Sequence, residues 1–231
     1  MPFTQPSAEL LENITVQFEK ASDPSYAGRM ENYMRNQFAF YGIPSPERKV
    51  LSSAIIAQNK AKIKTNWREV VELCWREPKR ELQYFAQELA AKHVKSFEKE
   101  DIALIEMMIT QKSWWDTVDF VASNLAGAYY RKFPEEIAPT VRRWMNSGNL
   151  WLCRTCLLFQ LKYGLNTDTG LLFACIGELG SSRDFFIRKA IGWSLRQLSK
   201  TNPDLVIEFV NKHKLPELSR KEALKIISKS R

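Results

Sequence analysis

The residues with the clearest potential for chemistry are an aspartate, an arginine and two tryptophans. Trp115 precedes Asp119 by four residues, a spacing that places both side chains on one face of a helix. Arg154 and Trp193 follow further along the chain. A carboxylate flanked by two indoles and a guanidinium could stabilise positive charge on a substrate and orient a water molecule. If folding gathers these four side chains, they form a candidate catalytic site.

A repeat along the chain predicts how they are gathered. Six positions separated by 34 to 36 residues fall in register: Val50, Ala86, Phe120, Thr155, Ala190 and Leu224. One place earlier, three consecutive units carry Asp119, Arg154 and Lys189, and Trp193 follows Lys189 by four residues. Such a period is typical of a solenoid whose helix pairs bury their apolar faces against their neighbours. We therefore expect an all-α, HEAT-like superhelix of about six helix pairs, with these charged residues on its concave face.

Local signals support an all-helical chain. Glycine, proline and asparagine recur between segments of helical periodicity, and no segment shows the alternation of a strand. Serines at positions 113, 181 and 219 are each followed three residues later by an acid, which predicts capping boxes at three helix starts. Ser45 before Pro46 predicts a fourth start. We expect a single domain over residues 1–231.

Composition narrows the classes of function. Lys and Arg number 34 against 26 acidic residues, for a formal net charge of +8, which suggests a polyanionic partner or, equally, a merely basic soluble surface. Cys153 and Cys156 form a C-x-x-C within an apolar helical segment, and we interpret them as core residues. With two histidines and no ligand cluster, we expect no metal and no cofactor. No segment is long and apolar enough for a membrane span, and residues 1–20 lack the pattern of a signal peptide, so we expect a cytoplasmic protein. We also expect a monomer.

The sequence around these residues resembles the AlkD-type DNA alkylation repair glycosylases over roughly residues 10 to 229. The resemblance is carried by KSWWDTVD at 112–119, NLWLCR at 149–154, FQLKY at 159–163 and DFFIRKAIGW at 184–193. Further matches are YMRN at 33–36, GIPSPER at 42–48, KTNPD at 200–204 and LSRKEA at 218–223. It implies a HEAT-like solenoid that holds duplex DNA and releases cationic N3- and N7-alkylated purines.

The resemblance also implies roles for individual residues. Asp119 matches the catalytic carboxylate, and Trp115 and Trp193 match the indoles beside it. Arg154 matches an arginine that contacts the DNA backbone. Aromatic positions near the lesion or the backbone are matched by Tyr33, Phe185 and Phe186, and Arg196 matches a basic residue beside the site. Further basic side chains fit phosphate contacts or, equally, an ordinary solvated surface: Arg35, Arg48, Lys49, Arg188, Lys189, Lys221 and Lys225.

A second interpretation belongs to a different class of protein. Asp119 could be a simple ion-pair partner of Arg154, and each tryptophan taken alone is more typical of packing than of chemistry. The chain would then be a non-catalytic helical-repeat protein that binds nucleic acid or another protein. Base release from alkylated DNA separates the two interpretations.

Overall fold

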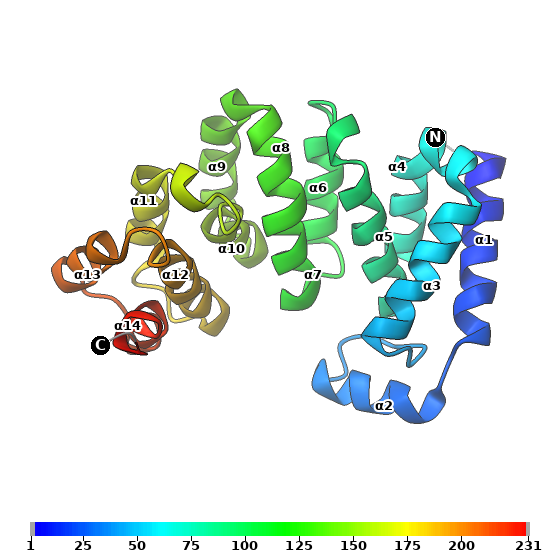
Figure 1. The fold of residues 1–231 in the computed structure, drawn as a ribbon, viewed down its shortest axis with the longest axis horizontal. Helices are drawn as coiled ribbons and strands as arrows, with labels where there is room; N and C mark the ends of the chain where they lie inside the picture. Colours follow the sequence, from blue (N-terminus) through cyan, green and yellow to red (C-terminus); the bar gives the residue numbers. More distant parts are fainter. Residues whose placement is uncertain (1–2, 230–231) are drawn as a thin grey trace. The chain divides into compact units, whose positions relative to one another are not determined.

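The computed structural model describes residues 3–229, which form two compact units that meet in sequence between Phe97 and Glu98. In this described part of the chain, the regular secondary structure is entirely helical, as predicted. Figure 1 shows the order of the helices along the chain. The only extended pairing in residues 3–229 is an isolated bridge between Ala39 and Lys79. None of the described helices is long and apolar enough to cross a membrane.

Unit 1 contains five α-helices within its described residues. They are α1 (Gln5–Lys20), α2 (Pro24–Tyr33), α3 (Ser45–Gln58), α4 (Lys60–Arg76) and α5 (Arg80–Lys92), followed by the 3-10 turn η1 (Val94–Ser96). Helices α1 and α4 pack together, as do α4 and α5, and Phe18 meets Phe85 edge to face in the core. The buried Glu81 carboxylate accepts hydrogen bonds from the backbone N–H groups of residues 41, 42 and 43. A buried carboxylate needs such donors. The bonds therefore hold the loop that precedes α3 against helix α5.

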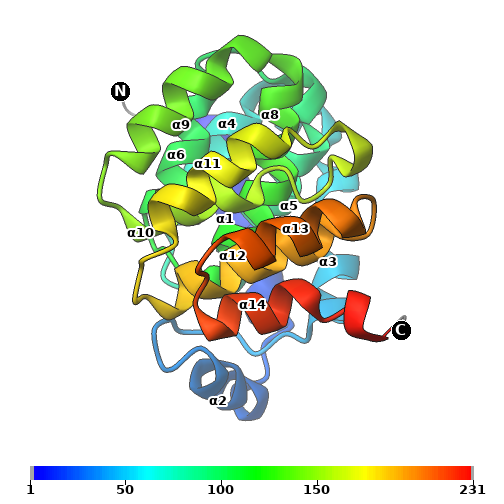
Figure 2. The ribbon, with the colours of Figure 1, turned by 90° about the vertical axis from the view of Figure 1, so that its left-hand side faces the viewer.

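Unit 2 holds the other nine α-helices of the described chain. They are α6 (Asp101–Thr110), α7 (Trp115–Phe120), α8 (Gly127–Lys132), α9 (Ile137–Met145), α10 (Leu150–Leu158), α11 (Thr169–Leu179), α12 (Phe185–Leu198), α13 (Pro203–Lys212) and α14 (Glu217–Leu224). Short helical turns lie at η2 (Val121–Ala126), η3 (Pro134–Glu136), η4 (Gly164–Asn166) and η5 (Ile227–Lys229). Helix α10 packs against α12, and α12 against α14 (Figure 2).

The predicted period matches the observed helices. The six register positions fall in α3, α5, α7, α10, α12 and α14, which are separated by one helix each, except that α8 and α9 both lie between α7 and α10. Helices α7 and α8 are joined through η2, a π-helical segment that follows directly after Asp119 and Phe120. Gly127 lets α8 approach the end of α10 closely, because a Cβ there would lie 2.5 Å from the carbonyl oxygen of Phe159. The two Cys153 and Cys156 thiols are free and buried, as expected for core residues.

The predicted helix starts are wrong in detail. Ser113 donates to the carbonyl oxygen of Ile109, and α7 begins two residues later. Helix α12 is capped by Asp184, which accepts from two backbone N–H groups. Helix α14 begins after Pro216, and Ser219 lies inside it. Helix α3 begins after Pro44, without a side-chain cap. At Ser113 the hydroxyl is used for a different bond, and at α12 Asp184 takes the cap position in place of Ser181, so a local serine motif does not by itself determine a helix start.

Candidate active site

Asp119 lies in α7 and is held by an arginine from α10. Arg154 donates from Nε to Asp119 Oδ1 over 2.7 Å and from Nη2 to Oδ2 over 2.9 Å. Its third nitrogen, Nη1, donates to the carbonyl oxygen of Phe186. The Arg154 side chain is 5% exposed and that of Asp119 is 16% exposed, so the arginine is enclosed and the carboxylate has access to solvent. This two-point grip fixes the plane of the carboxylate.

Burial and Arg154 act in opposite directions on the Asp119 carboxyl group. Burial raises the pKa of Asp119 above its ordinary value, because desolvation disfavours the charged form. The hydrogen bonds and charge of Arg154 oppose that rise, and the nearby negative charge of Asp116 adds to it. The net result is a raised pKa, so Asp119 is poised closer to the neutral range than an exposed aspartate.

The carboxylate opens into a cavity of about 260 Å³ within unit 2. Trp115 lines it from α7, and Trp193 lines it from α12, so the two indoles expected beside Asp119 share its cavity. The predicted aromatic residues Phe185 and Phe186 also line it, and Phe185 is 56% exposed. The four residues from which the sequence argument began are therefore brought together in one cavity.

A cluster of aromatic rings adjoins this cavity through Phe186, which belongs to both. Trp114 meets Phe186 with ring centroids 5.2 Å apart and Trp151 with centroids 5.9 Å apart. Trp151 and Phe186 are themselves 5.1 Å apart. Adjacent tryptophans thus take different roles, since Trp114 packs into the cluster and Trp115 lines the cavity. The cluster holds the start of α12 against α7 and α10, from which the acidic and basic groups project.

The remaining charged groups of the cavity come from α12 and α14. Lys189 and Arg196, both predicted to bind DNA, lie seven residues apart on α12 and line the cavity. Both are paired with Glu222, a residue from α14 that also lines it. The Lys189 Nζ to Glu222 Oε2 distance is 3.0 Å. The cavity therefore carries three positive and two negative side chains, an excess of one positive charge.

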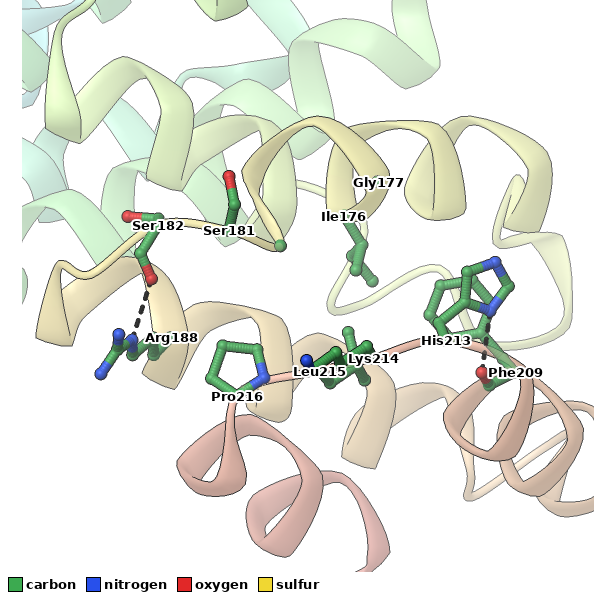
Figure 3. Close-up of a pocket in the computed structure, with 11 residues that line it drawn as sticks. Ile176, Gly177, Ser181, Ser182, Arg188, Phe209, His213, Lys214, Leu215 and Pro216 are labelled. Carbon is green, nitrogen blue, oxygen red and sulfur yellow. Dashed lines mark hydrogen bonds between the residues drawn. The ribbon is translucent and has the colours of Figure 1, made fainter.

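A larger cavity, of about 440 Å³, lies elsewhere in unit 2 (Figure 3). Arg188 lies at one end, where its Nε donates to the carbonyl oxygen of Ser182. At the other end His213 stacks on Phe209, with ring centroids 4.1 Å apart. Among the described residues no carboxylate lines this cavity. It therefore lacks the group that the predicted chemistry requires, and the smaller Asp119 cavity is the better candidate active site.

Comparison with known proteins decides the family. The sequence profile of the DNA alkylation repair enzymes matches residues 14–227, which include every residue of the Asp119 cavity. The chain belongs to the DNA alkylation repair enzyme family. The comparison with curated proteins gives no match.

Solved structures of similar proteins agree with this family member in fold. A structure described as a predicted DNA alkylation repair enzyme from Enterococcus faecalis is 34% identical and covers 90% of this chain and 97% of its own, with a TM-score of 0.83. AlkD2 from Streptococcus mutans is 19% identical and covers 77% of this chain and 87% of its own, with a TM-score of 0.57. The smu.31 protein from Streptococcus mutans UA159 is 18% identical and covers 87% and 97%, with a TM-score of 0.58.

Four more of the predicted DNA contacts of this family member lie in unit 1. Tyr33 is 70% exposed, Lys49 is exposed, and Arg35 is exposed with a positive φ of 55° in the turn after α2. Arg48 is different, because its side chain is only 6% exposed and donates to both oxygens of Glu88. That pair neutralises Arg48 within unit 1, whereas the other three side chains remain accessible.

Sequence reasoning missed two residues of the site and expected a different contact for a third. Nothing in the local sequence singled out Trp151, although it lies within a family motif. Glu222 was expected to cap a helix and instead pairs with two cations across the cavity. The backbone contact expected of Arg154 stays a prediction, but in the structure all three of its guanidinium nitrogens have protein partners.

Proposed function

We propose that this protein is a DNA glycosylase that hydrolyses the N-glycosidic bond of cationic N3- and N7-alkylated purines in duplex DNA. The observation that carries the proposal is a fixed, partly exposed carboxylate in a cavity flanked by two indoles. Its substrates would be lesions such as 3-methyladenine and 7-methylguanine. No cofactor or metal is needed for this reaction, and the partner is the damaged duplex.

The chemistry requires little more than a well-placed negative charge. Alkylation at N3 or N7 makes the purine cationic, so it leaves without protonation by a general acid. As the C1′–N bond breaks, its electron pair neutralises the base and positive charge develops on the deoxyribose. Water then adds to C1′ and loses a proton, which gives the free base and an abasic site. At about 4 Å and an effective dielectric of 20, a carboxylate would stabilise the sugar by about 4 kcal/mol, roughly a thousandfold in rate.

The ion pair with Arg154 leaves Asp119 able to act. Each carboxylate oxygen can accept about two hydrogen bonds, and Arg154 occupies one position on each. The remaining positions can receive the attacking water, while Arg154 keeps the carboxylate from rotating away. We therefore assign Arg154 as a positioning residue and Asp119 as the catalytic residue.

The indoles and the cations suit the rest of the substrate. Trp115 and Trp193 present π systems that attract cations by about 0.5 to 2 kcal/mol each, which favours an electron-poor sugar and an alkylated base. The excess positive charge from Lys189 and Arg196 suits a phosphate of the damaged strand. A volume of about 260 Å³ lies below the roughly 300–1,000 Å³ of pockets that enclose whole ligands. We therefore favour contact with the sugar at the lesion over enclosure of an extruded base.

The deciding experiment measures free bases released from globally methylated duplex DNA by the wild type and by Asp119→Asn. We expect release of 7-methylguanine and 3-methyladenine by the wild type, strong loss in the variant, and similar DNA affinity for both. Glu88→Gln, which disrupts the buried ion pair of unit 1, is the matched control. A wild type that releases no base would refute the proposal.

One observation favours the alternative of a non-catalytic DNA-binding scaffold. Asp119 is paired to Arg154 at two points, as a purely structural carboxylate would be. On this alternative the wild type binds duplex DNA but leaves methylated bases in place, and Asp119→Asn changes only stability. The base-release assay therefore separates the two functions directly.

A further inference from the structure

The cavity contains a second carboxylate, Glu222, whose position is fixed by close helix packing. A Cβ at Gly192 would lie 2.5 Å from Glu222 Cβ and 2.9 Å from the carbonyl oxygen of Ser219, so only glycine lets α14 settle on α12 at this point. Ser219 Oγ adds a hydrogen bond of 2.8 Å to the carbonyl oxygen of Arg188 on α12. The Glu222 side chain is 12% exposed. Glu222 is thus an enclosed group held in place by α12, unlike a freely moving surface acid.

Among the described residues that line the cavity, Glu222 is the only acidic residue besides Asp119. It accepts a hydrogen bond from Lys189 at Oε2 and forms an ion pair with Arg196 through Oε1. Without it, two long cationic side chains would share the cavity with Asp119 as the one remaining carboxylate. Lys189 is 39% exposed and sits on a flexible stem, so it is the cation best able to turn toward Asp119. A second ion pair there would neutralise the charge that the sugar needs.

We propose that Glu222 is a positioning residue that keeps Lys189 and Arg196 away from Asp119. It leaves the carboxylate of Asp119 available to the sugar and leaves the two cations with one net positive charge for a phosphate of the damaged strand. This role rests on the proposed glycosylase function, and it assigns to α14 an electrostatic part in that reaction.

The test compares Glu222→Gln with Glu217→Gln, a variant of the same helix that removes the same charge. Glu217 is 72% exposed and pairs only with Lys221 in the described contacts, outside the cavity. We expect Glu222→Gln to bind duplex DNA more tightly, with a salt dependence steeper by about 0.9 in the log–log slope. We also expect its single-turnover release of 7-methylguanine to fall by about tenfold or more, an effect of about 1.4 kcal/mol on the barrier. Glu217→Gln should leave the rate of release unchanged.

Two further readouts separate this role from a merely structural one. In Glu222→Gln the acid limb of the rate profile should move to lower pH, because a cation near Asp119 favours its charged form. Adding Lys189→Gln to Glu222→Gln should recover part of the lost rate, because it removes the competing cation. Loss of packing would neither move the acid limb to lower pH nor be reversed by Lys189→Gln.

The outcomes also keep this inference apart from the proposed function. If the wild type is active and Glu222→Gln releases base at the wild-type rate, the inference about Glu222 is overturned and the glycosylase remains. If Glu222→Gln loses rate and DNA affinity together, Glu222 is structural and the inference is again overturned. If the wild type releases no base at all, the proposed function fails before Glu222 is tested.

Discussion

Two arginine–carboxylate pairs with similar distances and burial lie in the two units of this molecule. In unit 1 Arg48 donates to both oxygens of Glu88 over 2.8 Å, and in unit 2 Arg154 donates to both oxygens of Asp119 over 2.7 and 2.9 Å. The arginine side chains are 6% and 5% exposed, and the carboxylates 19% and 16%. Distance and burial therefore do not distinguish the pairs, although Arg48 donates through Nη1 and Nη2 and Arg154 donates through Nε and Nη2.

The surroundings of the two pairs do differ. The guanidinium of Arg48 lies over the ring of Tyr84, 5.1 Å from its centroid. Asp119 instead opens into a cavity that it shares with Trp115 and Trp193, and the side chains that line this cavity carry an excess of one positive charge. An ion pair of this kind orients a carboxylate in either place. Only a carboxylate that shares a cavity with cation-attracting rings can also meet a substrate, so the cavity is what marks a candidate for catalysis.

The largest expected effect is on the rate of base release. Asp119→Asn should lower single-turnover release of 7-methylguanine by between about tenfold and about a thousandfold, because it removes the charge that opposes the sugar while Arg154 already neutralises part of it. Glu88→Gln should stay within about twofold of the wild type, well under 1 kcal/mol on the barrier. The measurement is free base released from methylated duplex per unit time. Equal losses in both variants would mean that the two pairs are equivalent and that neither carboxylate is catalytic.

Unlike the rate of base release, the free energy of unfolding should fall by a similar amount in Asp119→Asn and Glu88→Gln. Each variant leaves a nearly buried arginine without its charged partner, so each should lower the free energy of unfolding by about 1 to 3 kcal/mol. Urea unfolding followed by circular dichroism measures this, and the exposed variant Glu217→Gln serves as the control. A large loss for Asp119→Asn with none for Glu88→Gln would show that the pairs differ structurally, and the kinetic comparison would then need Asp119→Glu in place of the amide.

The flanking indoles should have a smaller kinetic effect. Trp193→Leu keeps an apolar side chain on α12 but removes the π system, and an attraction of about 0.5 to 2 kcal/mol corresponds to a rate loss of about two- to thirtyfold. Trp114→Leu removes an indole from the aromatic cluster that packs against Phe186. This variant should lower the free energy of unfolding by more than it raises the activation barrier for base release. Parallel rates and melting temperatures for the two variants would test this, and a rate loss confined to Trp114→Leu would contradict the assignment.

Sequence alone predicted the fold through its period. The six positions spaced by 34 to 36 residues lie in α3, α5, α7, α10, α12 and α14. They recur because packing between neighbouring repeats constrains the same position in each repeat. Helix starts were predicted poorly, because a serine followed by an acid is a purely local signal. At Ser219 the hydroxyl is used for a bond to α12, and at α12 the aspartate itself is the cap. The π-helical segment after Asp119 has no local signal in the sequence that we recognise.

The site was predicted where spacing within a helix and register between repeats determine contact. That reasoning placed Trp115, Asp119 and Trp193 on one surface, and they line one cavity. It could not place Glu222, whose entry depends on how closely α14 approaches α12 at Gly192. Whether a basic side chain meets a phosphate or a carboxylate likewise depends on distances of a few ångströms, which sequence does not give. Arg48 and Lys49 are neighbours in sequence, yet Arg48 is enclosed with Glu88 and Lys49 is exposed.

The smallest expected effect is on pH dependence, and it follows from the raised pKa of Asp119. Base release requires the carboxylate, so the acid limb of the rate profile should lie above the ordinary value of 3.8, and the rate should fall as pH falls through the raised pKa. The same shift has a consequence for stability, since a raised pKa means that the folded state favours the protonated form. The contribution of Asp119 to stability is therefore full below its ordinary pKa and is lost as pH rises through the raised value.

Subtracting the rate of Asp119→Asn at each pH removes acid depurination of the DNA. Because Arg154 opposes the rise, Arg154→Gln should move the limb to still higher pH, whereas a limb at or below 3.8 in the wild type would mean that the arginine outweighs burial.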